Sequence, residues 1–282
     1  MTLQRYGPLV LLALSAMMAA CREVTEPDPR PVVAVSVLPQ AFFVERIAGE
    51  RVRIQVMIPP GANPSTFEPS IDALKSLSGA VLYVALGHPH FAFEAAWIEK
   101  LLAEQPRLDV IRVMSESGDR NDDPHIWLSP RLVRVQAERI GAALQKVLPE
   151  DEDALQANLV DFLSEIETLD AELRTRLEPY QGRKIFVFHS AWGYFTRDYG
   201  LVQVSLEEGS KTPGAGALAS FIEEAKREKA RVIFVQPQFS QESARVVAQE
   251  IGAGVELLDP LARDWPSNLR RVAAAFEGAL RP

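Results

Sequence analysis

The chain has 282 residues, of which 47% are hydrophobic and 24% are charged, and its formal net charge is −8 at pH 7. This length suffices for one large domain or for two medium lobes. The acidic balance argues against nucleic acid or an anionic membrane surface as the main partner, and it is compatible with a cationic ligand.

The start of the chain has the pattern of an export signal. A short positive segment precedes an apolar run, residues 9–20, which is too short to span a bilayer comfortably and suits the core of a signal peptide. The four residues that end at Cys21, the only cysteine, read MAAC and resemble the lipobox of bacterial lipoproteins, with methionine in place of the usual leucine. We expect a signal peptide over residues 1–20, lipid on Cys21 and a flexible tether over residues 21–30. An ordinary secreted protein cut nearby is the alternative.

The next part of the chain alternates between apolar runs typical of strands and amphipathic runs typical of helices. Strands are expected at residues 31–38, 52–58, 80–86 and 109–113, and helices at 42–48, 71–78, 92–103 and 130–147. Ser70 is placed to cap the second of these helices. Strands that alternate with helices predict a parallel sheet with covering helices.

One long helix is predicted over residues 149–179. Its apolar residues recur at steps of three and four between charged residues: Leu155, Leu159, Phe162, Ile166, Leu169, Leu173 and Leu177. About 29 residues would reach roughly 43 Å, more than one small lobe needs, so we expect the helix to connect two lobes. A coiled-coil dimer is the alternative, but the apolar stripe lasts only about three heptads, and we expect a monomer.

After this helix the strand and helix alternation resumes. Strands are expected at residues 184–188, 201–206, 231–235 and 254–258, and helices at 217–229, 241–251 and 267–280. The predicted organisation is therefore an α/β lobe over residues 31–148, a linking helix over residues 149–179 and a second α/β lobe over residues 180–282.

The four histidines of the chain, His88, His90, His125 and His189, all fall in loops just after predicted strands or just before predicted helices. Asp259 also comes directly after a predicted strand, where open α/β sheets bind their ligands. Imidazole nitrogen and carboxylate oxygen suit Zn²⁺, with Mn²⁺ or Fe²⁺ also compatible. The long spacings match no zinc-finger or HExxH pattern. Spacing alone therefore leaves open that these are loop histidines bonded to their own surroundings.

Six segments between residues 32 and 280 make the chain recognisable: IPPGANPSTFEPS, DPHIWLSP, VFHSAWGYF, EEGSKTPGAG, VIFVQPQFS and LLDPLA. On these segments the chain resembles the periplasmic or surface-anchored substrate-binding proteins of zinc and manganese ABC transporters. The resemblance implies an α/β fold of two parallel-sheet lobes joined by one long rigid helix. It also implies a metal held in the cleft between the lobes.

The resemblance implies particular ligands as well. His125 of DPHIWLSP, His189 of VFHSAWGYF and Asp259 of LLDPLA fall on the metal-ligand positions of the family. A histidine at position 189, where the manganese branch has a glutamate, is more similar to the zinc branch. The acidic loop at residues 115–124 has no histidine, whereas many members of the zinc branch carry a histidine-rich loop there.

One position departs from the family. The first family ligand is a histidine, and this chain has Ser65 there, whose hydroxyl is a poor zinc ligand beside imidazole. Three alternatives follow: water completes the coordination, a histidine of the neighbouring loop replaces the missing one, or the site is degenerate. We expect the second, with His90 preferred over His88. Glu68 is a further donor, but we expect it to cap or pin its own loop.

The resemblance implies a lipid-anchored substrate-binding protein of an ABC importer, at the periplasm or cell surface, that captures Zn²⁺ and hands it to a membrane permease and its ATPase. We expect no catalysis, no nucleic acid partner and contact with the membrane through the lipid only. An exported zinc hydrolase with three protein ligands and water is one alternative, although we find no convincing general base, oxyanion motif or nucleophile elbow. An adhesion lipoprotein with a degenerate site is another. Ser190 and Glu208 are candidates for outer contacts to the ligands.

Overall fold

The computed structural model describes residues 28–105, 107–114, 123–207 and 214–281. Pro31–Pro282 form one compact unit. The predicted signal peptide, Cys21, most of the acidic loop and Glu208 lie outside the described residues. In the part of the chain that is described, no helix is both long enough and apolar enough to cross a membrane.

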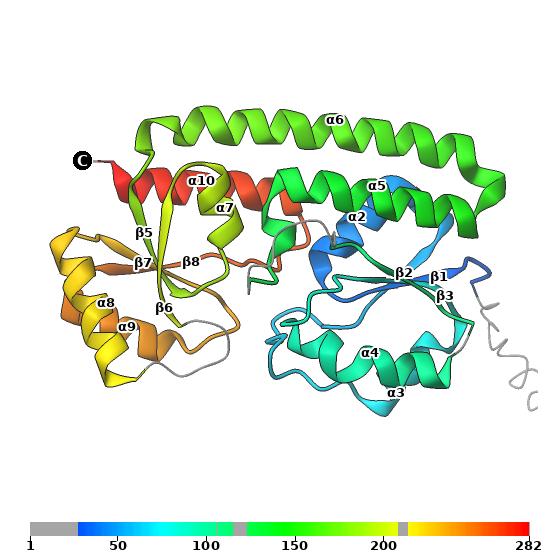
Figure 1. Cartoon of the computed structure of the whole chain (residues 1–282), viewed down its shortest axis with the longest axis horizontal. Coiled ribbons are helices and arrows are strands. Elements are labelled where there is room, and N and C mark those ends of the chain that lie inside the picture. The colour runs from blue at the N-terminus through cyan, green and yellow to red at the C-terminus, as the bar shows by residue number, and fades with distance from the viewer. Residues whose placement is uncertain (1–27, 106, 115–122, 208–213, 282) are drawn as a thin grey trace, which may run out of the picture. The chain divides into compact units, whose positions relative to one another are not determined.

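The N-terminal lobe is built on a parallel sheet with strand order β2-β1-β3-β4. Its strands are β1 (Val32–Val35), β2 (Arg53–Val56), β3 (Ala80–Ala85) and β4 (Asp109–Arg112). Helices α2 (Leu38–Ala48) and α5 (Pro130–Val147) cover one face, and α3 (Ile71–Ser76) and α4 (Ala92–Glu104) cover the other (Figure 1). Because β1 and β3 are covered on both faces, their sequences are almost continuously apolar.

The C-terminal lobe repeats this plan, with strand order β6-β5-β7-β8, again all parallel. Its strands are β5 (Lys184–His189), β6 (Val202–Glu207), β7 (Val232–Val235) and β8 (Gly254–Leu257). Helices α8 (Ala215–Arg227) and α9 (Gln241–Ile251) lie on one side, and α7 (Gly193–Asp198) and α10 (Trp265–Leu280) on the other (Figure 1). In both sheets the first strand of the lobe lies between the second and the third. This order leaves a crevice for a ligand at the carboxyl ends of the strands.

The predicted long helix is present as α6 (Glu152–Leu177), with a 3₁₀ turn at each end. Its 26 residues span about 39 Å. All seven residues of the predicted apolar stripe are buried, because α6 lies along α2, α5 and α10 (Figure 1). The stripe is therefore used for packing on both lobes.

The main apolar core is continuous between the lobes. Phe43 on α2 packs edge to face on Trp265 at the start of α10, with ring centroids 5.3 Å apart, and it also contacts Phe162 on α6 at 5.9 Å. Burying one such ring contributes about 1.5–3 kcal/mol. A smaller core lies between the second sheet and helices α8 and α9. The lobes are thus held together by apolar packing as well as by the linking helix.

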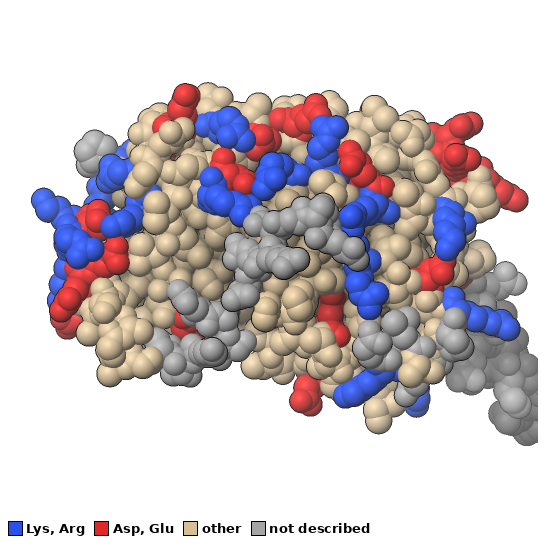
Figure 2. Space-filling model, viewed as in Figure 1, with Lys and Arg blue, Asp and Glu red and all other residues tan. Residues whose placement is uncertain are grey.

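The surface of the unit is charged but mixed. In Figure 2, lysine and arginine side chains are interspersed with acidic ones over the face shown. Ion pairs join the linking helix to both lobes, for example Arg134 with Glu167 and Arg270 with Glu172. Each such exposed pair contributes only about 0–1 kcal/mol to stability. Apolar packing is therefore the main interaction that holds the lobes together.

Helix α2 begins four residues earlier than the sequence predicted, at Leu38. Pro39 suits the first turn because its missing N–H needs no partner there. The Oε1 atom of Gln40 accepts hydrogen bonds from the backbone N–H groups of Ser36 (3.0 Å) and Val37 (3.2 Å). Apolar periodicity alone does not reveal this contact between the Gln40 side chain and the backbone before the helix.

Two other local features had different outcomes. Ser70 caps α3 as expected, since its Oγ accepts a hydrogen bond from the backbone N–H of Ala73 at 3.1 Å. Helix α7 was not predicted, because its six residues are too few for a helical period to be recognised. It is fixed instead by packing, with the Phe195 ring 5.7 Å from that of Phe276.

Candidate metal centre

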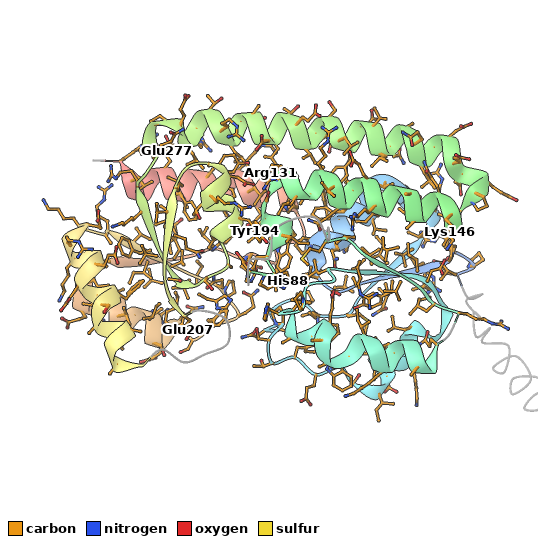
Figure 3. The ribbon with its side chains drawn as sticks, viewed as in Figure 1. His88, Arg131, Lys146, Tyr194, Glu207 and Glu277 are labelled. Atoms are coloured by element: carbon orange, nitrogen blue, oxygen red, sulfur yellow. The ribbon has the colours of Figure 1, made fainter. Side chains whose placement is uncertain are left out.

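A cavity of about 750 Å³ lies at the carboxyl ends of the strands and is lined by residues of both lobes. Three of the four histidines line it, namely His90, His125 and His189, and Ser65 lines it as well. The fourth histidine, His88, lies on the side of the N-terminal lobe that faces the C-terminal lobe (Figure 3). The structure therefore brings the sequence-predicted histidines to one place.

His125 and His189 form the centre of this cavity. Their ring centroids are 5.6 Å apart and the rings meet edge to face. His189 is the last residue of β5 and is buried, as expected for a side chain at the end of a central strand. His125 precedes the 3₁₀ turn Ile126–Leu128, and 14% of its side chain is exposed. Two imidazoles, one from before and one from after the linking helix in the sequence, are thus close enough to share a small ligand.

The His125 ring is oriented by Asp123, a residue that the sequence did not single out. Its Nδ1 lies 2.6 Å from Oδ1 of Asp123, and the same oxygen accepts a hydrogen bond from the backbone N–H of His125 at 2.9 Å. We assign the proton to Nδ1, which leaves the lone pair of Nε2 for a metal. A Cβ atom at Gly193 would come within 2.7 Å of the Oδ2 atom of Asp123, so glycine leaves room for this carboxylate.

The His189 ring is oriented by the segment that follows β7. Phe239 stacks on the ring, with centroids 4.5 Å apart and an interplanar angle of 26°. The side-chain amide of Gln236 donates a hydrogen bond to the backbone carbonyl of His189 at 2.9 Å. These residues belong to the segment VIFVQPQFS, which supported the family resemblance without any assigned role. Ser190, a predicted outer contact, lines the same cavity.

Asp259 follows β8 closely, as predicted, but it lies beside the cavity. Its Oδ1 accepts hydrogen bonds from Nε2 of Gln238 (2.8 Å) and from the backbone N–H of Leu261 (2.9 Å). Asp259 lines a neighbouring cavity of about 360 Å³, while Gln238 and Pro260 line the larger one. Within the described residues, no three His, Cys, Asp or Glu side chains are close enough to hold a metal ion. The role of Asp259 as a ligand stays a prediction.

The loop that carries His88 and His90 is fixed by Glu94 on α4. The carboxylate accepts hydrogen bonds from the backbone N–H groups of Leu86 (2.7 Å) and Gly87 (2.8 Å), and it contacts the Ser36 hydroxyl. Ser36 is in turn 3.0 Å from the hydroxyl of Tyr83. Burial raises the pKa of Glu94, and the bonds from Ser36, Gly87 and Leu86 oppose that rise. Burial, together with the charge of Glu94, also raises the pKa of Tyr83.

The structure separates the roles of the two histidines in this loop. His88 is 3% exposed, and its Nδ1 accepts a hydrogen bond from the backbone N–H of His90 at 3.1 Å. His90 is exposed and lines the cavity. Ser65 lies on the same cavity, with its backbone N–H bonded to Oδ1 of Asn63 at 2.9 Å, whereas Glu68 is exposed and outside the lining. His90 is therefore the better placed of the two to replace the missing family histidine.

The comparison with known families fits this geometry. A family model described as "Zinc-uptake complex component A periplasmic", ZnuA, matches residues 33–279. The chain belongs to this family. Its ZnuA-type relatives include the "High-affinity zinc uptake system protein ZnuA" of Bacillus subtilis, 25% identical over 81% of this chain and 78% of the relative.

The "Zinc-binding lipoprotein AdcA" of Streptococcus pneumoniae is 25% identical over 90% of this chain. The match covers 54% of AdcA, so the chain spans about half the length of that relative. A crystal structure of ZnuA is 42% identical, with a TM-score of 0.84, and the match covers 89% of this chain and all of that one. The periplasmic zinc-binding protein TroA of Treponema pallidum, 18% identical, shares the fold with a TM-score of 0.81 and coverage of 90% and 100%. These likenesses confirm the predicted α/β fold of two lobes and one long helix.

Proposed function

We propose that this protein binds Zn²⁺ as cargo in the cleft between its lobes and delivers it to the permease of an ABC importer. The observation that carries the proposal is the His125–His189 pair. Their ring centroids are 5.6 Å apart, on a cavity that His90 also lines. The match of residues 33–279 to the zinc-uptake family supports the same cargo. The names of the Bacillus subtilis and Streptococcus pneumoniae relatives, high-affinity zinc uptake and zinc-binding lipoprotein, agree with it.

In this proposal the ligands are His90, His125, His189 and Asp259. Three imidazoles and one carboxylate fit the four-coordinate preference of zinc and its affinity for nitrogen. Asp259 would exchange its hydrogen bond with Gln238 for the metal, or keep it on Oδ1 and coordinate through Oδ2. Water next to Ser65 is the alternative to His90.

We further infer that the protein works without chemical turnover, as a monomer, with a permease and its ATPase as partners. We also propose its processing and organisation: a signal peptide over residues 1–20, lipid on Cys21, a tether to residue 30, lobes over residues 31–148 and 180–282, and the linking helix over 149–179. Exported location at the periplasm or cell surface follows from the signal and agrees with the periplasmic description of the family. No observation favours the hydrolase or the adhesion alternative.

The direct test is competition for zinc between the purified protein and a chromogenic chelator. We expect one equivalent of Zn²⁺ to bind, more tightly than Mn²⁺. A cell that lacks the gene should then grow poorly in zinc-depleted medium and recover when zinc is added. Absence of zinc binding, or recovery with manganese alone, would contradict the proposal.

A further inference from the structure

The segment His125–Ser129 lies in the N-terminal lobe by sequence, but both ends of it form hydrogen bonds to the C-terminal lobe. The indole N–H of Trp127 donates to the backbone carbonyl of Pro260 at 2.7 Å. The indole N–H of Trp265 donates to the backbone carbonyl of Trp127 at 2.6 Å. Pro260 directly follows the predicted ligand Asp259. The two bonds therefore tie the His125 segment to the part of the second lobe that carries another predicted ligand.

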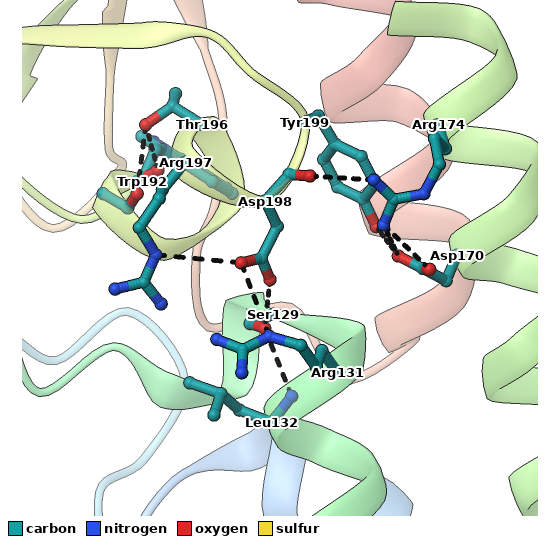
Figure 4. Close-up of polar contacts among 11 residues, drawn as sticks. Ser129, Arg131, Leu132, Asp170, Arg174, Trp192, Thr196, Arg197, Asp198 and Tyr199 are labelled. Carbon is teal, nitrogen blue, oxygen red and sulfur yellow. Dashed lines mark hydrogen bonds and ion pairs between the residues drawn. The ribbon is translucent and has the colours of Figure 1, made fainter. Parts of the chain in front are cut away.

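The other end of the segment is tied to helix α7, which follows His189. The hydroxyl of Ser129 contacts Oδ2 of Asp198, the last residue of α7, and the same hydroxyl accepts a hydrogen bond from the backbone N–H of Leu132 at 3.2 Å (Figure 4). Ser129 thus caps α5 and reaches the second lobe at once. The Asp198 side chain is 7% exposed. A carboxylate at the start of the 18-residue helix α5 is favoured by the helix dipole.

Asp198 is itself held in place from several sides. The Nε atoms of Arg131 and Arg197 each lie 3.8 Å from its Oδ1. Its backbone carbonyl accepts a hydrogen bond from Arg174 on the linking helix at 3.2 Å, and the hydroxyl of the next residue, Tyr199, donates to Asp170 on the same helix at 2.9 Å (Figure 4). Asp198 is therefore a fixed point to which the His125 segment is attached.

We propose that Asp198 is a positioning residue for zinc binding. Acting through Ser129, it holds the His125 segment against the C-terminal lobe, so that His125 and His189 form a preset pair before the metal arrives. Such presetting strengthens binding because less of the interaction energy is spent on ordering the ligands. His90 comes from a different loop, after β3, and completes the site from the first lobe. This inference rests on the proposed zinc function.

The test measures zinc affinity and the visible absorption of bound Co²⁺ in wild type, Asp198→Ala, Asp198→Asn and Ser129→Ala. We expect Asp198→Ala and Ser129→Ala each to weaken zinc binding by about tenfold and to change the Co²⁺ spectrum, since His125 loses its fixed place. Asp198→Asn keeps an oxygen that accepts from Ser129, so it should bind nearly as wild type does. The double variant Asp198→Ala/Ser129→Ala should bind no more weakly than either single one.

The matched control is Ser70→Ala, which removes the same kind of helix cap from α3. It should lower the melting temperature as Ser129→Ala does, without changing zinc affinity or the Co²⁺ spectrum. Wild-type affinity and spectrum in both Asp198→Ala and Ser129→Ala would overturn the inference, as would independent, additive losses in the double variant. If the wild-type protein itself binds no zinc, the proposed function fails instead, which keeps the two outcomes distinct.

Discussion

The two sides of the cleft hold their predicted zinc ligands in different ways. On the C-terminal side, contacts fix the side chains themselves: Phe239 stacks on His189, and Gln238 bonds Asp259. On the N-terminal side, Asp123 orients the His125 ring, but the contacts to the His90 loop fix only its backbone, through Glu94, and leave the His90 side chain exposed. We therefore expect His125 and the ligands of the C-terminal side to form a preset part of the site. The N-terminal side adds His90, which we expect to order only when the metal arrives.

Oriented and exposed ligands should contribute differently to zinc affinity. Side chains that are already oriented lose little conformational freedom on binding, so they contribute most of the affinity. An exposed side chain has to give up rotamer freedom, on the order of 1 kcal/mol, before it contributes. Substitutions on the C-terminal side should therefore cost more zinc affinity than substitutions in the His90 loop.

The largest effect is expected from removing a predicted ligand of the C-terminal side. His189→Ala and Asp259→Ala should each lower zinc affinity by well over tenfold, and by more than about 100-fold for His189, since losing even an outer contact to a ligand costs about 10–100-fold. Competition with a chromogenic chelator measures the change, and circular dichroism checks that the fold is kept. Unchanged affinity in both variants would remove these residues from the site.

A smaller effect is expected on the N-terminal side. His90→Ala should weaken zinc binding by about tenfold, because one imidazole is lost but water can take its place. The informative comparison is Ser65→His, which restores the family histidine. If Ser65→His strengthens binding while His90→Ala changes nothing, then water and not His90 completes the coordination in the natural protein.

A third substitution affects His125 indirectly, through the carboxylate of Asp123. Gly193→Ala places a methyl group where the Oδ2 atom of Asp123 lies 2.7 Å away, so the carboxylate that orients His125 has to move. We expect zinc affinity to fall by up to about tenfold, as for loss of an outer contact. Gly278→Ala on α10, where nothing lies within 4 Å of the new methyl group, is the control and should leave affinity as it is. Equal affinities in the two variants would show that Asp123 does not orient His125.

Much of the fold could be predicted from the sequence, because the signals are local or periodic. The stripe from Leu155 to Leu177 predicts α6 within a few residues, and the apolar runs predict each parallel strand. The positions of His189 at the end of a strand and of Asp259 just after one follow from the same pattern. The order of the strands in each sheet was not predicted, since it depends on contacts between distant segments.

For the candidate site, the sequence predicts ligands, which stay a prediction, but not the residues that hold those side chains in place. Asp123 is two residues from His125, and that short spacing is a signal the sequence offered. Gln236 and Phe239 touch His189 across about 50 residues of chain, which no local pattern indicates. The choice between His88 and His90 depended on the direction of their loop. The sequence could not give that direction, because Glu94 fixes it from the following helix.

The smallest effect on zinc, and the clearest effect on stability, is expected from Glu94→Gln. The side-chain amide keeps one oxygen, so one of the backbone N–H groups of Leu86 and Gly87 loses its acceptor. An unsatisfied buried group costs about 1–3 kcal/mol of unfolding free energy. Zinc affinity should fall by less than about tenfold, since the loop of His90 loosens while the C-terminal side keeps its contacts. Glu223→Gln, at an exposed position of α8, is the control and should change neither quantity.

The pH dependence of stability gives a second measurement on the same variant. Because burial raises the pKa of Glu94 in the folded protein, protonation favours the folded state. The extra unfolding free energy that this gives is fully present below the ordinary carboxyl pKa of about 4.3. It is lost as pH rises through the raised pKa of Glu94. Glutamine does not titrate, so the gap in unfolding free energy between wild type and Glu94→Gln should narrow in urea titrations as pH rises above that ordinary value. A gap that stays constant as pH rises above that ordinary value would mean that the bonds from Ser36, Leu86 and Gly87 outweigh burial, and that the loop of His90 is held by an ionised carboxylate.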